Sequence, residues 1–110
     1  MNEVLLVLTT MPDRTSAQGL ARLLVDQQLA ACVNCLPGVK SVYRWHGVVE
    51  EAEEVQLLIK TTRSRYAELE AAILAAHPYQ LPEIIALPVV GGLPAYLDWI
   101  TLETKKDVNV

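Results

Sequence analysis

Two histidines offer the most evident metal chemistry in the sequence. His77 ends a stretch with helical spacing and precedes Pro78, so it stands at a chain reversal where side chains from several elements can converge. A neutral imidazole is a good ligand for copper, zinc or nickel, but one histidine per chain is a weak site unless symmetry or a neighbouring chain adds groups. The alternative is a histidine that bonds a free carbonyl at the helix end. His46 precedes Gly47, and we predict that it lies in a turn.

Two cysteines match C-x-x-C, but their context is wrong for a redox pair. Cys32 and Cys35 lie inside an apolar run typical of a strand, whereas a redox pair opens a helix. Residues three apart in a strand point to opposite faces, with Cα atoms about 10 Å apart at a rise of about 3.3 Å per residue. That separation exceeds the roughly 7 Å that a disulfide tolerates. It also prevents both thiolates from binding one ion, so we expect two small buried hydrophobic side chains.

The acidic residues form no evident acid–base pair. Four glutamates lie close together in a predicted strand, namely Glu50, Glu51, Glu53 and Glu54. Strand carboxylates point both ways, which favours a solvated face or a charged edge over chelation. Asp13, Glu83 and Asp98 fit caps or loops. A phosphate-binding glycine loop, a nucleophile elbow and a zinc-protease motif are all missing from the sequence, and we predict no enzymatic activity.

Length and composition limit the class of protein. The 110 residues make one domain, 1–110, and the net charge of −4 opposes binding to nucleic acid or to an anionic membrane surface. Apolar runs stay far below the roughly 20 residues of a membrane span, and two cysteines make no disulfide scaffold, which favours the cytoplasm. A hydrophobic fraction of 52% is high for so small a domain. The surplus favours a subunit interface, unless alanine and leucine simply fill helices.

The elements that must position these residues follow from the spacing of apolar side chains. We predict a strand over 4–8, a helix capped by Asp13, a strand over 29–36 that Pro37 interrupts and a hairpin over 39–60. A second helix capped by Ser64 and ended by Pro78, a strand over 83–87 and a helix opening at Pro94 follow. The apolar stripes of the first two helices extend to Val25 and Ala76. The last residues are expected to form a short edge strand or to fray. This β-α-β-β-α-β order with a C-terminal helix predicts an α+β fold, the ferredoxin-like split βαβ arrangement. The hairpin outreaches a small domain, so Tyr43 and Trp45 would meet solvent unless a neighbouring subunit covers them.

Several short strings, in this order and at this spacing, resemble the CutA family, the divalent-cation tolerance proteins. They run from about Val4 to Ile100: Thr10-Met11-Pro12-Asp13, Leu29-Ala30-Ala31-Cys32-Val33-Asn34, Pro37-Gly38, Ser41-Val42-Tyr43-Arg44-Trp45-His46-Gly47, Lys60-Thr61, His77-Pro78-Tyr79, Pro82-Glu83-Ile84 and Tyr96-Leu97-Asp98-Trp99. The resemblance implies a ferredoxin-like subunit in a tight homotrimer, similar in architecture to the PII signalling proteins. It also implies tolerance to copper and other divalent metals.

The copper ligands that the resemblance implies are only partly present. The family's proposed ligands are a cysteine at the end of the first strand and two adjacent histidines before Pro-Tyr. These positions hold Thr9, Ala76 and His77 here, so a thiolate and one imidazole are missing. His77 is therefore the one metal ligand that we predict. The metal would be copper(II) or another divalent cation, with no organic cofactor.

Two other functions are alternatives to metal tolerance. In the first, a PII-like sensor or trimeric adaptor would bind a small molecule in clefts between subunits and contact a partner protein through the hairpin tip. In the second, a small hydrolase of the acylphosphatase type would present an arginine in an anion-binding loop. Arg14 is the nearest candidate for that arginine, but it follows the acid Asp13.

Overall fold

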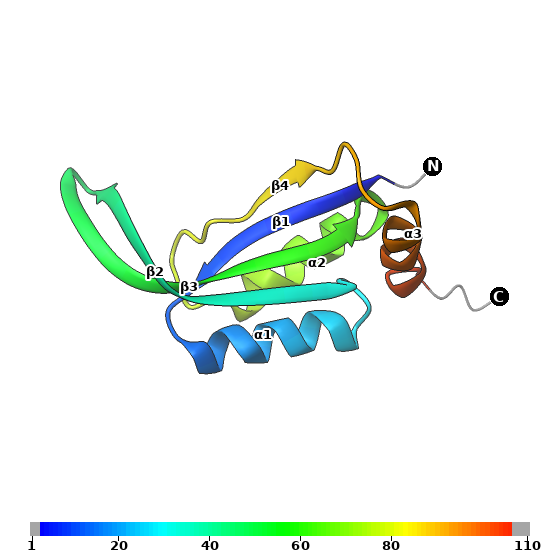
Figure 1. Ribbon diagram of the computed structural model, residues 1–110. Helices are drawn as coiled ribbons and strands as arrows, with labels where there is room; N and C mark the ends of the chain where they lie inside the picture. The colour runs from blue at the N-terminus through cyan, green and yellow to red at the C-terminus, as the bar shows by residue number, and fades with distance from the viewer. Residues whose placement is uncertain (1–2, 107–110) are drawn as a thin grey trace.

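A four-stranded antiparallel sheet with the order β2-β3-β1-β4 forms the frame of the protein (Figure 1). A computed structural model describes residues 3–106. The elements in chain order are β1 (Val4–Met11), α1 (Arg14–Asp26), β2 (Cys32–Trp45), β3 (Val48–Thr62), α2 (Arg63–Ala76), β4 (Ile85–Pro88) and α3 (Pro94–Glu103). The predicted α+β class and the β-α-β-β-α-β order with a C-terminal helix are confirmed.

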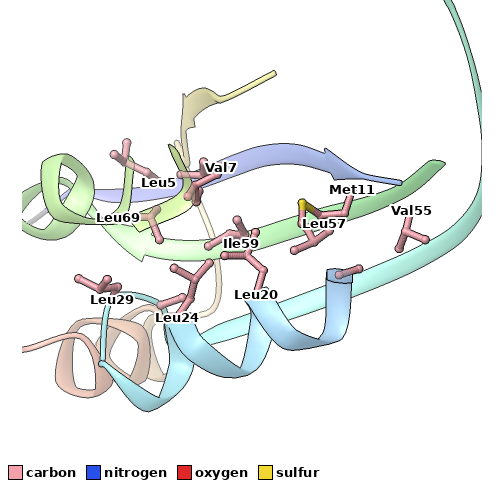
Figure 2. Packing of buried hydrophobic residues seen from close by; sticks show 13 residues of the cluster. Leu5, Val7, Met11, Leu20, Leu24, Leu29, Val55, Leu57, Ile59 and Leu69 are labelled. Carbon is pink, nitrogen blue, oxygen red and sulfur yellow. The ribbon is translucent and has the colours of Figure 1, made fainter. Parts of the chain in front are cut away.

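The main core lies between the sheet and the helices α1 and α2. Alternation along β1 and β3 directs one set of side chains to this side, including Val7, Leu57 and Ile59, which are completely buried (Figure 2). They meet Leu24 of α1 and Leu69 of α2, which are also completely buried. Burying one such side chain stabilises the fold by about 1.5–3 kcal/mol. This layer therefore holds the two helices on the sheet.

The opposite face of the sheet is covered at one end by α3. There α3 packs Ile100 against Val4 and Ala31. Farther along, the apolar side chains of Leu6 and Leu8 are only half-buried within one chain. Several apolar side chains of the outer strands are more exposed still, namely Leu36, Ile85 and Leu87. We call these five residues, Leu6, Leu8, Leu36, Ile85 and Leu87, the open apolar face.

Strands β2 and β3 extend beyond the rest of the sheet as an arm (Figure 1). Trp45 pairs with Val48, and the two residues between them, His46 and Gly47, have φ angles of 49° and 81°. Two positive φ angles are what a tight two-residue hairpin turn requires, so the turn prediction for His46 is confirmed. The pairing skips between Leu36 and Val39, which places a bulge at the base of the arm.

The ends of the elements differ from the sequence prediction in several places. Asp13 caps α1 as expected, since its carboxylate accepts a hydrogen bond of 2.8 Å from the Ser16 amide. The prediction that Ser64 caps α2 is wrong, because β3 runs directly into the helix and Thr62 holds the cap position. Strand β1 continues past Leu8 to Met11 because β3 pairs with it to its end.

The fourth strand is Ile85–Pro88, whereas 83–87 was predicted. Val25 and Ala76, expected on apolar helix stripes, are exposed, because both lie near helix ends beyond the sheet contact. The expectation for the final residues concerns 107–110, which lie outside the described part of the chain. Within residues 3–106, no helix has the length and apolar character needed to cross a bilayer.

Candidate functional site

His77 joins the end of α2 to the end of β1. Its backbone is extended because Pro78 follows, and this ends the helix at Ala76. Strand β4 begins opposite Leu8, so the edge of β1 at Thr10 lies beyond its reach. His77 lies against this edge, with Nε2 only 2.7 Å from the carbonyl oxygen of Thr10. The imidazole therefore bonds a carbonyl, but that carbonyl belongs to a distant strand rather than to its own helix.

The hydrogen bonds of His77 determine which ring nitrogen carries the proton. A carbonyl oxygen only accepts, so Nε2 must donate its hydrogen to Thr10. The backbone amide of Tyr79 donates to Nδ1 at 3.2 Å, so Nδ1 must hold a lone pair. The ring is thus a neutral imidazole with its proton on Nε2. Both nitrogens have partners within the chain.

Tyr79 connects the histidine to a buried carboxylate. Its hydroxyl donates a hydrogen bond of 2.8 Å to Oε2 of Glu54, and its ring centroid lies 4.8 Å from that of His77. Glu54 is only 7% exposed. Burial raises the pKa of Glu54, but hydrogen bonds from Ser41, Tyr79 and Thr10 oppose burial, and the net effect holds the pKa below its ordinary value. Glu54 is therefore a carboxylate at neutral pH.

The phenol of Tyr79 stays protonated for a complementary reason. Burial is the main cause that raises its pKa, and the hydrogen bond to Glu54 and the charge of that carboxylate raise it further. Because the carboxylate accepts and the phenol donates, the two groups stabilise each other's protonation state. We call Thr10, Ser41, Glu54, His77 and Tyr79 the polar cluster.

Four parts of the chain assemble the polar cluster. Thr10 pairs with Gln56 across β1 and β3, and Glu54 lies two residues from Gln56, so both side chains share the face opposite the main core. Ser41 enters from β2 just beyond the bulge, where Val39 pairs with Glu54.

A cavity of about 400 Å³ adjoins Glu54, lined by Pro12, Asp13, Arg14, Pro37, Gly38, Glu53, Glu54 and Val55. Its three carboxylates and one guanidinium give it an acidic lining.

The structure limits what one chain can offer to a metal ion. The side chain of Thr9 is completely buried on the core side, and its hydroxyl has no hydrogen-bond partner among the described residues. Ala76 has no ligating group. Within residues 3–106, no three histidine, cysteine, aspartate or glutamate side chains gather in a way that could hold a metal. The described residues of one chain therefore offer no complete coordination sphere for a metal ion.

The two cysteines point to opposite faces, as predicted. Both are free thiols. Cys35 packs against the main core, with its sulfur 4.0 Å from the carbonyl oxygen of Ala17, and burial raises its pKa. Cys32 faces the other side, where the Lys60 ammonium lies 3.8 Å from its sulfur. Both cysteines are half-buried rather than fully buried, because the sheet edge at β2 is only partly covered.

Among the other candidates, Glu54 requires a correction. Glu50, Glu51 and Glu53 are exposed on the arm as expected, but Glu54 is buried in the polar cluster instead of lying on a solvated face. Strand alternation does not reveal this, because Glu50 lies on the same strand face as Glu54. The decisive contact comes from Tyr79, which sequence reasoning did not select as a site residue.

The remaining acidic and basic candidates lie outside the polar cluster. Asp13 caps α1, and hydrogen bonds from the Ser16 amide and hydroxyl are the main cause that lowers its pKa. Arg14, the first residue of α1, lines the acidic cavity. Glu83 is exposed before β4, and Asp98 lies within α3 rather than at its cap. None of these brings a second ligand to His77.

Comparisons with known proteins agree with this fold over nearly the whole chain. A family model described as the CutA1 divalent ion tolerance protein matches residues 5–103. A divalent-cation tolerance protein CutA of Thermus thermophilus is 46% identical over 104 residues, which is 94% of this chain and 99% of the relative. A chloroplastic protein CutA of Arabidopsis thaliana is 43% identical over 92% of this chain, but over only 56% of its own length.

Solved structures give the same result. The crystal structure of CutA from Xylella fastidiosa superposes with a TM-score of 0.91 at 48% identity, covering 94% of this chain and 99% of that one. The crystal structure of the protein named CutA1 from Oryza sativa superposes with a TM-score of 0.92 at 39% identity, covering 96% of each chain. The chain therefore belongs to the CutA1 divalent ion tolerance family.

Proposed function

We propose that this protein acts in the response to divalent metal ions as a cytoplasmic, non-enzymatic homotrimer that binds copper(II) through His77. The observation that carries the proposal is the hydrogen bond from Nε2 of His77 to the Thr10 carbonyl. Histidines that bind metals usually donate their other ring N–H to a carbonyl or carboxylate, which fixes the tautomer and orients the ligating nitrogen. In His77 the ligating nitrogen would be Nδ1.

The proposed trimer has two sources of support within one chain. The open apolar face leaves leucine side chains half-covered or exposed, including Leu36 at 42% and Leu87 at 43% exposure. The arm presents further apolar side chains beyond the sheet, including Val42 and Val48. Contiguous exposed apolar surface on a soluble domain favours a protein interface. Neighbouring subunits would cover both regions and could add the ligands that one chain lacks.

The test is a calorimetric titration of chelator-stripped protein with copper(II), with the assembly mass checked by light scattering. Wild type, His77→Ala and His46→Ala are compared. His46 is the matched control, because it is an exposed imidazole in the hairpin turn. We expect three equivalent sites per trimer that persist in His46→Ala and disappear in His77→Ala. Equal affinity in wild type and His77→Ala would exclude His77 as the ligand.

The acidic cavity favours a second candidate, a PII-like sensor or adaptor. The cavity of about 400 Å³ is of a size that binds small molecules, and the buried residue Glu54 forms part of its wall. In this alternative the arm would contact a partner protein. A thermal-shift screen of nucleotides, amines and carboxylic acids tests it, with Glu54→Gln as the variant. A ligand that stabilises wild type but not Glu54→Gln would support the sensor, and a screen without hits would count against it.

A further inference from the structure

We propose that Tyr79 and Glu54 form a latch that limits the access of a metal ion to Nδ1 of His77. The inference rests on the proposed function, because it concerns the regulation of the same ligand. Tyr79 is a positioning residue in this proposal. Its hydroxyl donates a hydrogen bond to Glu54, and its backbone amide donates a hydrogen bond to Nδ1 of His77.

Nδ1 of His77 has a single lone pair, and that lone pair already has a partner. An imidazole nitrogen without a proton has one lone pair in the plane of the ring, and it accepts either an N–H or a metal ion. The Tyr79 amide takes that position at 3.2 Å. The second ring nitrogen offers no alternative, because Nε2 donates to Thr10. As the chain is folded here, His77 has no nitrogen available to a metal ion.

A contact at the far end of the Tyr79 side chain holds its backbone amide in place. The hydroxyl at the other end of Tyr79 donates to Oε2 of Glu54 at 2.8 Å. Hydrogen bonds to an ionised group are roughly twice as strong as those between neutral groups. Glu54 is itself fixed, because it is 7% exposed and also bonds Ser41 and Thr10. Tyr79 is thus held at both ends, by the histidine and by the carboxylate.

These contacts lower the apparent affinity of His77 for a metal ion. To free Nδ1, the segment from His77 to Tyr79 must rotate, and the contact between Tyr79 and Glu54 resists this rotation. A ligand that binds only the open state has its apparent affinity reduced by the fraction of molecules that are open. Removing the Tyr79 hydroxyl should raise that fraction about tenfold, the lower end of what a hydrogen bond to a charged group contributes. Copper(II) should then bind about tenfold more tightly.

The experiment compares wild type, Tyr79→Phe, Tyr66→Phe and His77→Ala. Tyr66→Phe is the matched control, because it deletes the same hydroxyl from the partly buried Tyr66 of α2. Copper(II) affinity is measured by calorimetry. Two readouts without metal accompany it: the ¹⁵N shifts of the His77 ring and the amide hydrogen exchange of residue 79. We expect Tyr79→Phe to bind copper(II) about tenfold more tightly and to exchange the amide of residue 79 faster, and Tyr66→Phe to match wild type.

Two outcomes separate the latch from the ligand. Unchanged or weaker copper(II) binding in Tyr79→Phe, with binding lost in His77→Ala, would overturn the latch and leave the ligand in place. Unchanged binding in His77→Ala would overturn both. Stopped-flow mixing of wild type with copper(II) avoids dependence on any variant. A latched site predicts an observed rate that reaches a plateau at high copper(II), and a rate that rises linearly throughout would contradict the latch.

Discussion

The two faces of the sheet differ in how completely one chain covers them. The face toward α1 and α2 is filled by side chains such as Leu57 and Ile59, which have no exposure at all. The other face combines the polar cluster, half-buried leucines and the single end contact made by α3. Adjacent residues of β1 show the contrast, since Thr9 faces the core and Thr10 faces the polar cluster. Stability thus comes mainly from one face, which leaves the other available for assembly and binding.

The largest expected effect tests this difference directly. Leu57→Ala removes a completely buried side chain from the main core and should cost about 2–5 kcal/mol of unfolding free energy. Leu36→Ala removes the same atoms from the opposite face, where the residue is 42% exposed in one chain. Urea denaturation measures both losses.

The loss of unfolding free energy in Leu36→Ala depends on whether neighbouring subunits cover the open apolar face. If the open apolar face is exposed to solvent, Leu36→Ala should lower the unfolding free energy by less than about 1 kcal/mol. The reason is that a side chain already in contact with water gains little from folding. If neighbouring subunits cover the face, the loss should approach that of Leu57→Ala and should depend on protein concentration. A large loss that does not depend on concentration would contradict both accounts.

A smaller effect is expected at the junction between the two faces. Asp13 caps α1 through the Ser16 amide at the point where β1 gives way to the helix. Asp13→Ala should lower the unfolding free energy by about 1 kcal/mol, and Asp13→Asn should retain most of it. Thermal unfolding at fixed pH measures this. Equal losses in both variants would mean that the charge, rather than the cap hydrogen bond, matters.

The smallest expected effect is the pH dependence contributed by Glu54. Hydrogen bonds in the folded state lower its pKa below the value of 4.5 expected for the unfolded chain, although burial opposes this shift. The stability that Glu54 contributes is therefore fully present above pH 4.5 and is lost as the pH falls through its folded pKa. The difference in unfolding free energy between wild type and Glu54→Gln should shrink on acidification from pH 6 to about pH 3. A difference that stays constant would show that no net shift exists.

Local features of the fold could be predicted from the sequence, whereas the contents of the site could not. Alternation and the His46-Gly47 pair predict the hairpin, Asp13 predicts a cap, and Pro78 predicts the end of α2. Each depends on neighbours within a few residues. Ser64 was an incorrect cap because nothing local shows that β3 passes into α2 without a loop.

The polar cluster depends on contacts between residues far apart in the sequence. The partner of His77 is 67 residues away in β1, and the partner of Tyr79 is 25 residues away in β3. Sequence reasoning selected His77 from the chemistry of imidazole, but the tautomer and the masked Nδ1 follow from Thr10 and Tyr79. Glu54 could not be separated from the other glutamates of its run, since only the bulge and Tyr79 distinguish its surroundings.

The bulge between Leu36 and Val39 gives the arm a mechanical property. A tight two-residue turn and continuous pairing join β2 and β3 along the arm, so the two strands move as one rigid unit. The pairing of β2 with β3 is interrupted at Pro37 and Gly38, so the arm bends most easily at these two residues. That pivot lines the cavity beside Glu54. Bending of the arm at the bulge would therefore change the shape of the acidic cavity.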